Sequence, residues 1–219
     1  MTGYDVTCQS GQNFAFDPAN TALLVIDMQK DFLLEADGSA NDMFSIVPDV
    51  SRLTALCRDL RCTIIHTREA YRADLSDVTP HKASMNYVGR PGPRGKYLIA
   101  GEPGCDFIDA LAPLPGETVL DKPGFGAFST TDMDTVLKAA NITHLILCGV
   151  TMQCCVHSTL REAVDHGYWC LTVADCCGAL KPEWHAATLE IIRSEDHLFG
   201  GICGISDLEA ATHSKAGNS

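Results

Sequence analysis

Short apolar runs without polar alternation recur along the chain. They occupy residues 21–26 (TALLVI), 63–66 (TIIH), 118–120 (TVL), 143–148 (THLILC) and 169–173 (WCLTV). A strand of a parallel sheet is covered on both faces, so its sequence is apolar throughout rather than at every second position. The runs therefore predict five buried parallel strands.

Segments with helical periodicity lie between these runs. They span residues 47–60, 132–140, 153–166 and 182–194, and each carries apolar residues at spacings of three and four. Such a stripe lets a helix pack on one face of a sheet. Strands that alternate with helices of this length predict right-handed crossovers and an α/β fold with a doubly wound parallel sheet. A chain of 219 residues fits one such domain, over residues 1–219.

Residues 71–115 interrupt this alternation, because they contain six prolines and several glycines and show little periodicity. A surface excursion explains the composition. Excursions of this length within a compact domain are uncommon, however, and tend to form lids or binding walls.

The net charge of −12 disfavours a nucleic-acid partner, because phosphate binding requires a basic face. It does not exclude an anionic small-molecule substrate. No apolar run is long enough to cross a membrane, and the first residues, MTGYDVTCQS, do not resemble a signal peptide. We therefore expect a cytoplasmic protein with no membrane partner.

Eleven cysteines would suggest a disulfide scaffold in a small secreted chain, but this chain is long and has an apolar core. No Cys-x-x-Cys pair occurs, and the adjacent pairs lack the spacing of a zinc site. We interpret most of these thiols as packing residues, since a free cysteine behaves as a small hydrophobic side chain.

Three reactive side chains directly follow predicted strands, where ligands bind in a doubly wound sheet. Asp27 ends the segment LLVID, Lys122 follows TVLD, and Cys155 lies between a strand and a helix. Each has a simpler explanation: a turn aspartate, a solvated lysine and a core cysteine.

Together the three would form a nucleophilic site. A helix N-terminus and a lysine stabilise a thiolate, and a carboxylate can accept the thiol proton. Free backbone N–H groups of the same helix start can bind an oxyanion.

Six motifs occur in order over residues 21–207. They read LLVIDMQKDF, HTRE, GEPG, PGETVLDKPGFGAF, CGVTMQCCVHSTLREAVDHGY and ADCCGA. In these blocks the chain resembles the isochorismatase-like cysteine hydrolases. The resemblance implies that Asp27, Lys122 and Cys155 form a catalytic triad that needs no cofactor. It selects Cys155 over Cys154, because valine follows the nucleophile in the family.

The resemblance also implies a cis peptide between Val150 and Thr151, with the amides of Thr151 and Cys155 forming an oxyanion hole. Asp27 would deprotonate Cys155, and the thiolate would attack the carbonyl of a C–N bond. Water activated by Asp27 would then hydrolyse the thioester or thiocarbamate, while Lys122 keeps Asp27 ionised.

The reactive cysteine points to amide chemistry rather than to the vinyl ether of true isochorismatases. Nicotinamidases of this family have an Asp-x-His…His metal site, whereas here only His66 and His81 occur in that region, so we expect no metal. The blocks HTRE, GEPG and KPGFGAF look most like the biuret and triuret hydrolases. The alternatives are another carboxamide (maleamate, ureidoacrylate or nicotinamide) and a non-catalytic scaffold.

Two residues are candidates for substrate binding. Phe32 lies five residues after Asp27, where the family often places an aromatic wall; a core phenylalanine is the alternative. Glu195 matches a position at which biuret hydrolases carry glutamine, although it also fits a solvated helix end. A carboxylate there would favour NH-rich or cationic groups, such as triuret or a guanidino-ureide. The sequence leaves the roles of Arg68, Glu69 and Tyr71 open. The resemblance also implies a homodimer or homotetramer.

Overall fold

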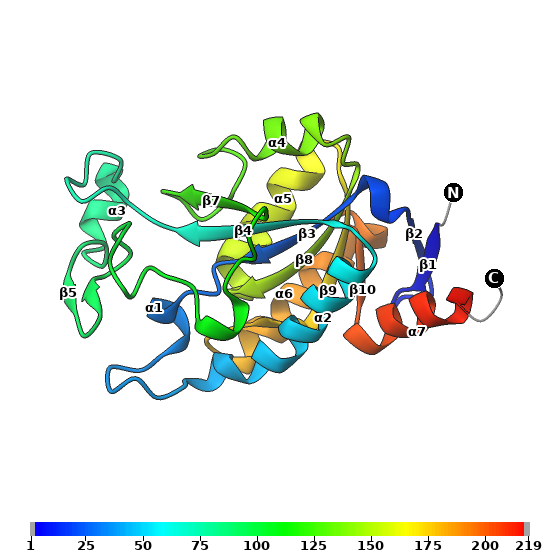
Figure 1. Cartoon of the computed structure of the whole chain (residues 1–219), viewed down its shortest axis with the longest axis horizontal. Helices are drawn as coiled ribbons and strands as arrows, with labels where there is room; N and C mark the ends of the chain where they lie inside the picture. Colours follow the sequence, from blue (N-terminus) through cyan, green and yellow to red (C-terminus); the bar gives the residue numbers. More distant parts are fainter. Residues whose placement is uncertain (1–2, 217–219) are drawn as a thin grey trace.

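A six-stranded parallel sheet forms the centre of the molecule, in the order β10-β9-β8-β3-β4-β7 (Figure 1). Its strands are β3 (Thr21–Ile26), β4 (Thr63–Glu69), β7 (Thr118–Lys122), β8 (His144–Val150), β9 (Trp169–Gly178) and β10 (Gly201–Cys203). From β3 the chain winds to β4 and β7 on one side and to β8, β9 and β10 on the other. The computed structural model describes residues 3–216, with side chains as far as His213. Within this range the predicted doubly wound α/β fold is confirmed.

Helices cover both faces of the sheet (Figure 1). Their bounds are α2 (Val47–Asp59), α4 (Met133–Ala139), α5 (His157–Asp165), α6 (Pro182–His197) and α7 (Ile205–Ala216). Leu23 and Val25 of β3 share one core with α2 and α7, whereas Leu24 and Ile26 share the other with α4, α5 and α6. Successive side chains of a strand point to opposite faces, so an uninterrupted apolar run serves both cores.

The predicted strands and helices are confirmed, but several end later than predicted. β4 continues to Glu69, β7 to Lys122 and β9 to Gly178. Each extension adds polar or small residues that an apolar pattern does not detect. The helix predicted over 153–166 begins with a π-helical turn, Met152–Val156, and becomes regular in α5.

Four elements at the ends of the chain were not predicted. The hairpin of β1 (Tyr4–Thr7) and β2 (Asn13–Phe16) lies at the same end of the molecule as α7 (Figure 1). Strand β10 has three residues and α7 a weak apolar stripe, so neither gave a clear signal. Among the described residues, no helix is long and apolar enough to cross a membrane.

The proline-rich excursion, residues 71–115, extends from the opposite end of the sheet (Figure 1). It contains α3 (Pro80–Ser84) and the short strands β5 (Pro91–Gly92) and β6 (Gly95–Lys96). Tyr71, Leu98 and Ile99 form a small core of its own.

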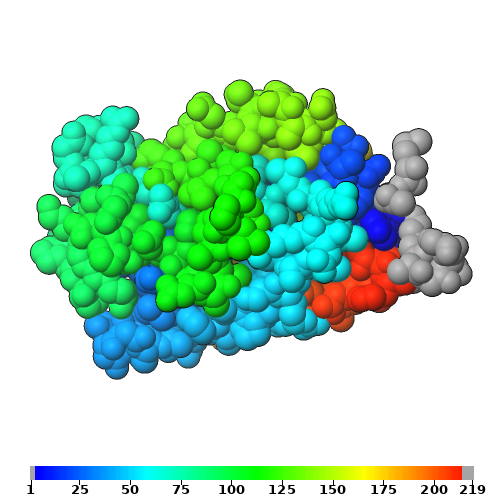
Figure 2. Space-filling model, in the orientation of Figure 1, coloured from blue at the N-terminus to red at the C-terminus, as the bar shows by residue number. Residues whose placement is uncertain are grey.

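Hydrogen bonds join the excursion to the segment that follows α1 (Lys30–Leu33). The Arg94 guanidinium donates to the carbonyl oxygens of Leu34 and Glu35, at 2.8 Å each. Figure 2 shows the two segments side by side at one end of the molecule. They form a wall beyond the carboxyl ends of the strands.

Candidate active site

Asp27 and Lys122 form a fully buried ion pair, with Lys122 Nζ 2.7 Å from Asp27 Oδ2. Asp27 follows β3 in a left-handed conformation (φ 52°), which aspartate tolerates better than most residues. Thr67 Oγ1 donates to Asp27 Oδ1 at 2.7 Å, and Lys122 Nζ donates to Gly124 O at 2.9 Å. A carboxylate oxygen has two lone pairs, so Oδ2 can accept a proton from another donor beside Lys122.

Burial and the ion pair act in opposite directions on the two charges. Burial raises the pKa of Asp27, partly offset by Lys122 and by the hydrogen bond from Thr67. Burial disfavours the Lys122 ammonium, but Asp27, Cys155 and Glu69 together outweigh burial and raise the pKa of Lys122. Lys122 is therefore a fixed cation, and Asp27 is a carboxylate ready to take up a proton.

Cys155 lies in the π-helical turn that follows β8, and it is 4% exposed. A cis peptide joins Val150 to Thr151 at the start of this turn. Val156 N–H donates to Thr151 O at 3.2 Å as the turn closes. The N–H groups of Thr151 and Cys155 therefore both belong to the opening of the helix, where backbone donors lack partners further back along the helix.

The surroundings of Cys155 act on the pKa of its thiol in opposite directions. The neighbouring Cys154 thiol and burial raise the pKa of Cys155, while Lys122 opposes this rise. The net rise favours the thiol over the thiolate, against the effect expected from the helix start and the lysine. A base must instead remove the proton as the sulfur attacks.

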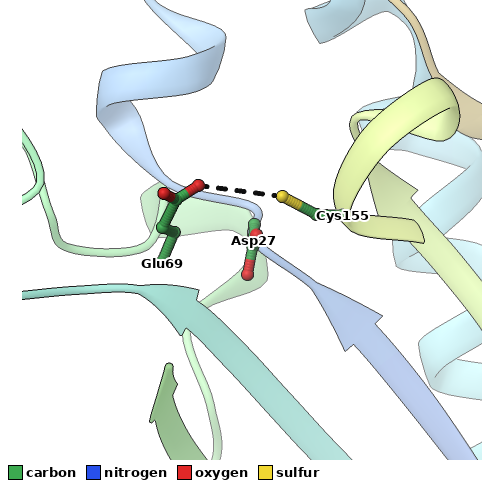
Figure 3. A group of neighbouring side chains, drawn as sticks. All are labelled: Asp27, Glu69 and Cys155. Carbon is green, nitrogen blue, oxygen red and sulfur yellow. Dashed lines mark hydrogen bonds between the residues drawn. The ribbon is translucent and has the colours of Figure 1, made fainter. Parts of the chain in front are cut away.

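Glu69, whose role the sequence left open, lies beside the predicted triad. Its Oε2 is 3.8 Å from Cys155 Sγ, and the carboxylate points from the end of β4 toward the thiol (Figure 3). Ligand atoms of Asp27, Glu69 and Cys155 all lie within 4.8 Å of one another. The two-residue period of a strand is the signal that could have identified Glu69, because it puts Glu69 on the same side of β4 as Thr67.

Three donors from the excursion hold the other oxygen of Glu69. The hydroxyls of Tyr71 and Tyr87 donate to Oε1 at 2.7 and 2.9 Å, and Lys82 Nζ lies 3.5 Å from it. Lys82 Nζ also contacts the Tyr71 hydroxyl and lies 3.9 Å from the centroid of the Phe125 ring. The sequence gave no indication of Lys82 or Tyr87, because both lie in a segment without periodicity.

Cys155 forms part of the lining of a cavity of about 440 Å³. The excursion supplies Met85, Tyr87 and Tyr97 to its wall, and the turn that carries the cysteine supplies Thr151 and Gln153. A volume of this size suits a small organic molecule.

Of the two predicted substrate-binding residues, Phe32 lies at the cavity and Glu195 does not. Phe32 lines the cavity and packs edge to face against Tyr97, with 6.3 Å between the ring centroids. Glu195 is exposed and is not among the described residues that line the cavity. The chain leaves the α6 helix at Ser194, and Glu195 and Asp196 adopt left-handed conformations beyond it. The position of Glu195 therefore does not support the expected contact with substrate.

The histidines considered as metal ligands lie elsewhere. His66 Nε2 is 2.9 Å from Glu117 Oε2, and His81 is exposed on α3. Among the described residues, the one group of three with metal-ligand spacing is Asp27, Glu69 and Cys155. The ammonium of Lys122, 2.7 Å from Asp27, would repel a divalent cation there, so the group suits acid–base and nucleophilic chemistry better.

Comparison with known proteins identifies the family of this chain. A family model described as the isochorismatase domain matches residues 21–206. The ureidoacrylate amidohydrolase RutB of Cronobacter sakazakii is 31% identical over 174 residues, which cover 73% of this chain and 75% of that protein. The maleamate amidohydrolase of Pseudomonas putida is 30% identical over 186 residues, 84% of each chain.

A solved structure has the same fold. It is a cysteine hydrolase from Pseudomonas syringae pv. phaseolicola, and it superimposes with a TM-score of 0.79 at 26% sequence identity. The match covers 91% of this chain and 95% of the other.

Proposed function

Because this chain belongs to the isochorismatase domain family, we propose that it is an amidohydrolase that cleaves a C–N bond of a small, uncharged ureide of the biuret or triuret type, with Cys155 as nucleophile. The observation that carries the proposal is the cluster at the cavity. A buried thiol there lies within 4.8 Å of a carboxylate that is ion-paired to Lys122.

The first half of the reaction is acyl transfer. Asp27 accepts the thiol proton as Cys155 Sγ bonds to the substrate carbonyl carbon, and the N–H groups of Thr151 and Cys155 receive the oxyanion. The C–N bond then breaks, and the same proton passes from Asp27 to the leaving nitrogen. Ammonia or an amine departs and leaves a thioester or thiocarbamate on Cys155.

The second half is hydrolysis of that intermediate. Asp27, again a carboxylate, takes a proton from water as the water attacks the acyl carbon. The C–S bond breaks and the proton returns to the sulfur. A carboxyl group that is already protonated cannot act as a base. In both halves the charge of Lys122 lowers the pKa of Asp27 and so favours its ionised form.

The charge of the cavity wall favours an uncharged or cationic substrate. The described lining residues include the carboxylates Asp31, Glu35 and Glu69 but no lysine, arginine or histidine. Behind the wall, Lys82 and Lys122 are each engaged with a carboxylate, and Arg94 donates to the carbonyl oxygens of Leu34 and Glu35. Biuret and triuret are neutral and rich in N–H groups, so they fit this wall.

The second candidate is a carboxylate-bearing substrate, either an amide such as maleamate or a ureide such as ureidoacrylate. The two curated relatives described above, whose names specify these activities, favour it at about 30% identity. Such a substrate would have to place an anion against a wall that carries Asp31, Glu35 and Glu69, which is unfavourable at short range.

Ammonia release from a panel of substrates tests the proposal. We expect biuret or triuret to give a higher kcat/KM than maleamate, ureidoacrylate and nicotinamide. Cys155→Ser should lower kcat by roughly a thousandfold or more, since loss of a nucleophile removes most of the catalytic effect. Cys154→Ser is the matched control, and it should retain activity.

Two outcomes would contradict the proposal. Fastest turnover of maleamate or ureidoacrylate would establish the second candidate. Undiminished activity of Cys155→Ser would exclude the nucleophile itself.

A further inference from the structure

Glu69 is a buried carboxylate whose two oxygens have different surroundings. Oε1 receives the Tyr71 and Tyr87 hydroxyls and the ion pair with Lys82. Oε2 faces Cys155 Sγ at 3.8 Å (Figure 3). The side chain is 3% exposed, so water does not readily replace these partners.

The donor that faces Oε2 is lost during the proposed reaction. Once Cys155 is acylated, its sulfur carries no proton. A buried carboxylate oxygen without a donor is costly, and a charged acceptor more so than a neutral one. The acyl group on sulfur therefore decides whether Oε2 regains a hydrogen bond.

A ureide and a carboxamide differ at this point. An acyl group from a ureide has nitrogen next to its carbonyl carbon, and that N–H lies two bonds from the sulfur. An oxygen 3.8 Å from the sulfur is within its reach. An acyl group from a carboxamide has carbon at that position and offers no donor.

We infer that Glu69 is the specificity-determining residue that selects ureides over carboxamides, by accepting a hydrogen bond from the nitrogen next to the acyl carbon. Tyr71, Tyr87 and Lys82 are positioning residues, since they hold Oε1 and so fix the direction of Oε2. The inference rests on the proposed function, because it requires acylation of Cys155.

Biuret and malonamide form a matched pair for the test. Both present two terminal carboxamide groups, and malonamide has CH₂ where biuret has the central NH. Loss of ammonia then leaves an acyl group with an N–H next to the carbonyl carbon in one case and a CH₂ in the other. The quantity to measure is the ratio of kcat/KM for biuret to that for malonamide.

Glu69→Gln should lower this ratio by about 10- to 100-fold, the range for a hydrogen bond to a charged group. The donors around Oε1 require an acceptor there, so the glutamine amide would direct its NH₂ toward the substrate N–H. The fall should come from biuret, with malonamide little changed. Glu190→Gln, on the exposed face of α6, is the matched control and should leave the ratio unchanged.

Both kcat/KM values are measured on the same preparation of a variant. A partial loss of folded enzyme lowers both equally and leaves their ratio unchanged. If Glu69→Gln does not fold, Glu69→Asp provides the same test, because it withdraws the oxygen by one methylene and keeps the charge. An unchanged ratio in the folded variant would overturn the inference and leave the proposed function standing. If malonamide turnover is too slow to detect, kcat/KM for biuret alone is compared. An unchanged value in Glu69→Gln would then overturn the inference and leave the proposed function standing. Wild-type protein that hydrolyses neither biuret nor triuret would overturn the proposed function as well.

Discussion

Lys122 and Asp27 are both fully buried, so each charge depends on the other. Removal of one partner leaves an uncompensated charge in the interior, at a cost of about 3–5 kcal/mol. We predict that Lys122→Met lowers the free energy of unfolding by roughly that amount and also abolishes turnover. Urea denaturation at neutral pH measures the first effect.

The double variant Asp27→Asn/Lys122→Met is the control, because it removes both charges. It should recover much of the stability but none of the activity. Equal stability of the single and double variants would mean that Asp27 takes up a proton once Lys122 is removed and leaves no buried charge.

Individual residues of the site were predictable to different degrees. Asp27, Lys122 and Cys155 could be proposed because each lies at the end of a recognisable strand or in the turn beyond it. Glu69 ends a strand whose predicted end was three residues earlier, and Tyr87 lies within the irregular excursion. Their roles depend on contacts between distant segments, which a single sequence does not specify.

At the scale of elements, the close approach of β8 to β3 depends on Gly149. Its φ is +118°, and a Cβ atom there would lie 2.1 Å from the carbonyl oxygen of Ile26. We predict that Gly149→Ala costs about 3 kcal/mol or more, because backbone must move to relieve the overlap. The displaced strand leads into the turn that carries Cys155, so activity should fall as well.

Gly167→Ala is the matched control. Gly167 also has a positive φ, of +90°, but an added Cβ would have no heavy atom within 4 Å. Its expected cost is about 1–2 kcal/mol, from backbone conformation alone. Thermal unfolding of both variants compares them, and equal losses would argue against a tight β3–β8 contact.

Glu117 links three elements at the edge of the sheet. It accepts hydrogen bonds from Arg58 of α2 at 2.6 and 2.9 Å, and His66 of β4 lies 2.9 Å away. Burial opposes ionisation, yet the donors Arg58, Leu114 N and His66 lower the pKa of Glu117 to about 2.

A lowered folded-state pKa stabilises the protein above the unfolded value of 4.5, and the contribution is lost as the pH falls toward 2. We predict that this linkage contributes about 2 kcal/mol at neutral pH. Glu117→Gln should flatten the dependence of the unfolding free energy on pH between about 5 and 2. A slope equal to that of wild type would show that other carboxylates control acid unfolding.

For the whole molecule, the sequence predicted the architecture better than its boundaries. Apolar runs and helical stripes specified the central sheet and the helices that cover it, because both patterns follow from burial. The hairpin β1–β2 and the helix α7 pack at one end, where short elements with mixed polarity leave a weak pattern. The excursion was recognised by its prolines, but its fold depends on contacts with Leu34 and Glu35 that composition does not encode.

The expected homodimer or homotetramer stays a prediction. Trp169 and Leu198 are 68% and 53% exposed and line the same surface hollow, so association that covered them would bury apolar area. Light scattering coupled to gel filtration should give twice or four times the chain mass of 23.6 kDa. A single monomer peak at micromolar concentration would contradict this expectation.

The measurement that tests the central claim most directly is detection of the covalent intermediate on Cys155. The enzyme is quenched in acid during turnover of biuret, digested, and the peptide that contains Cys154 and Cys155 is fragmented in a mass spectrometer. The account predicts an acyl group on Cys155 in the wild type and in Cys154→Ser, and none in Cys155→Ser. An acyl group on Cys154, or turnover with no adduct on either thiol and undiminished activity of Cys155→Ser, would contradict it.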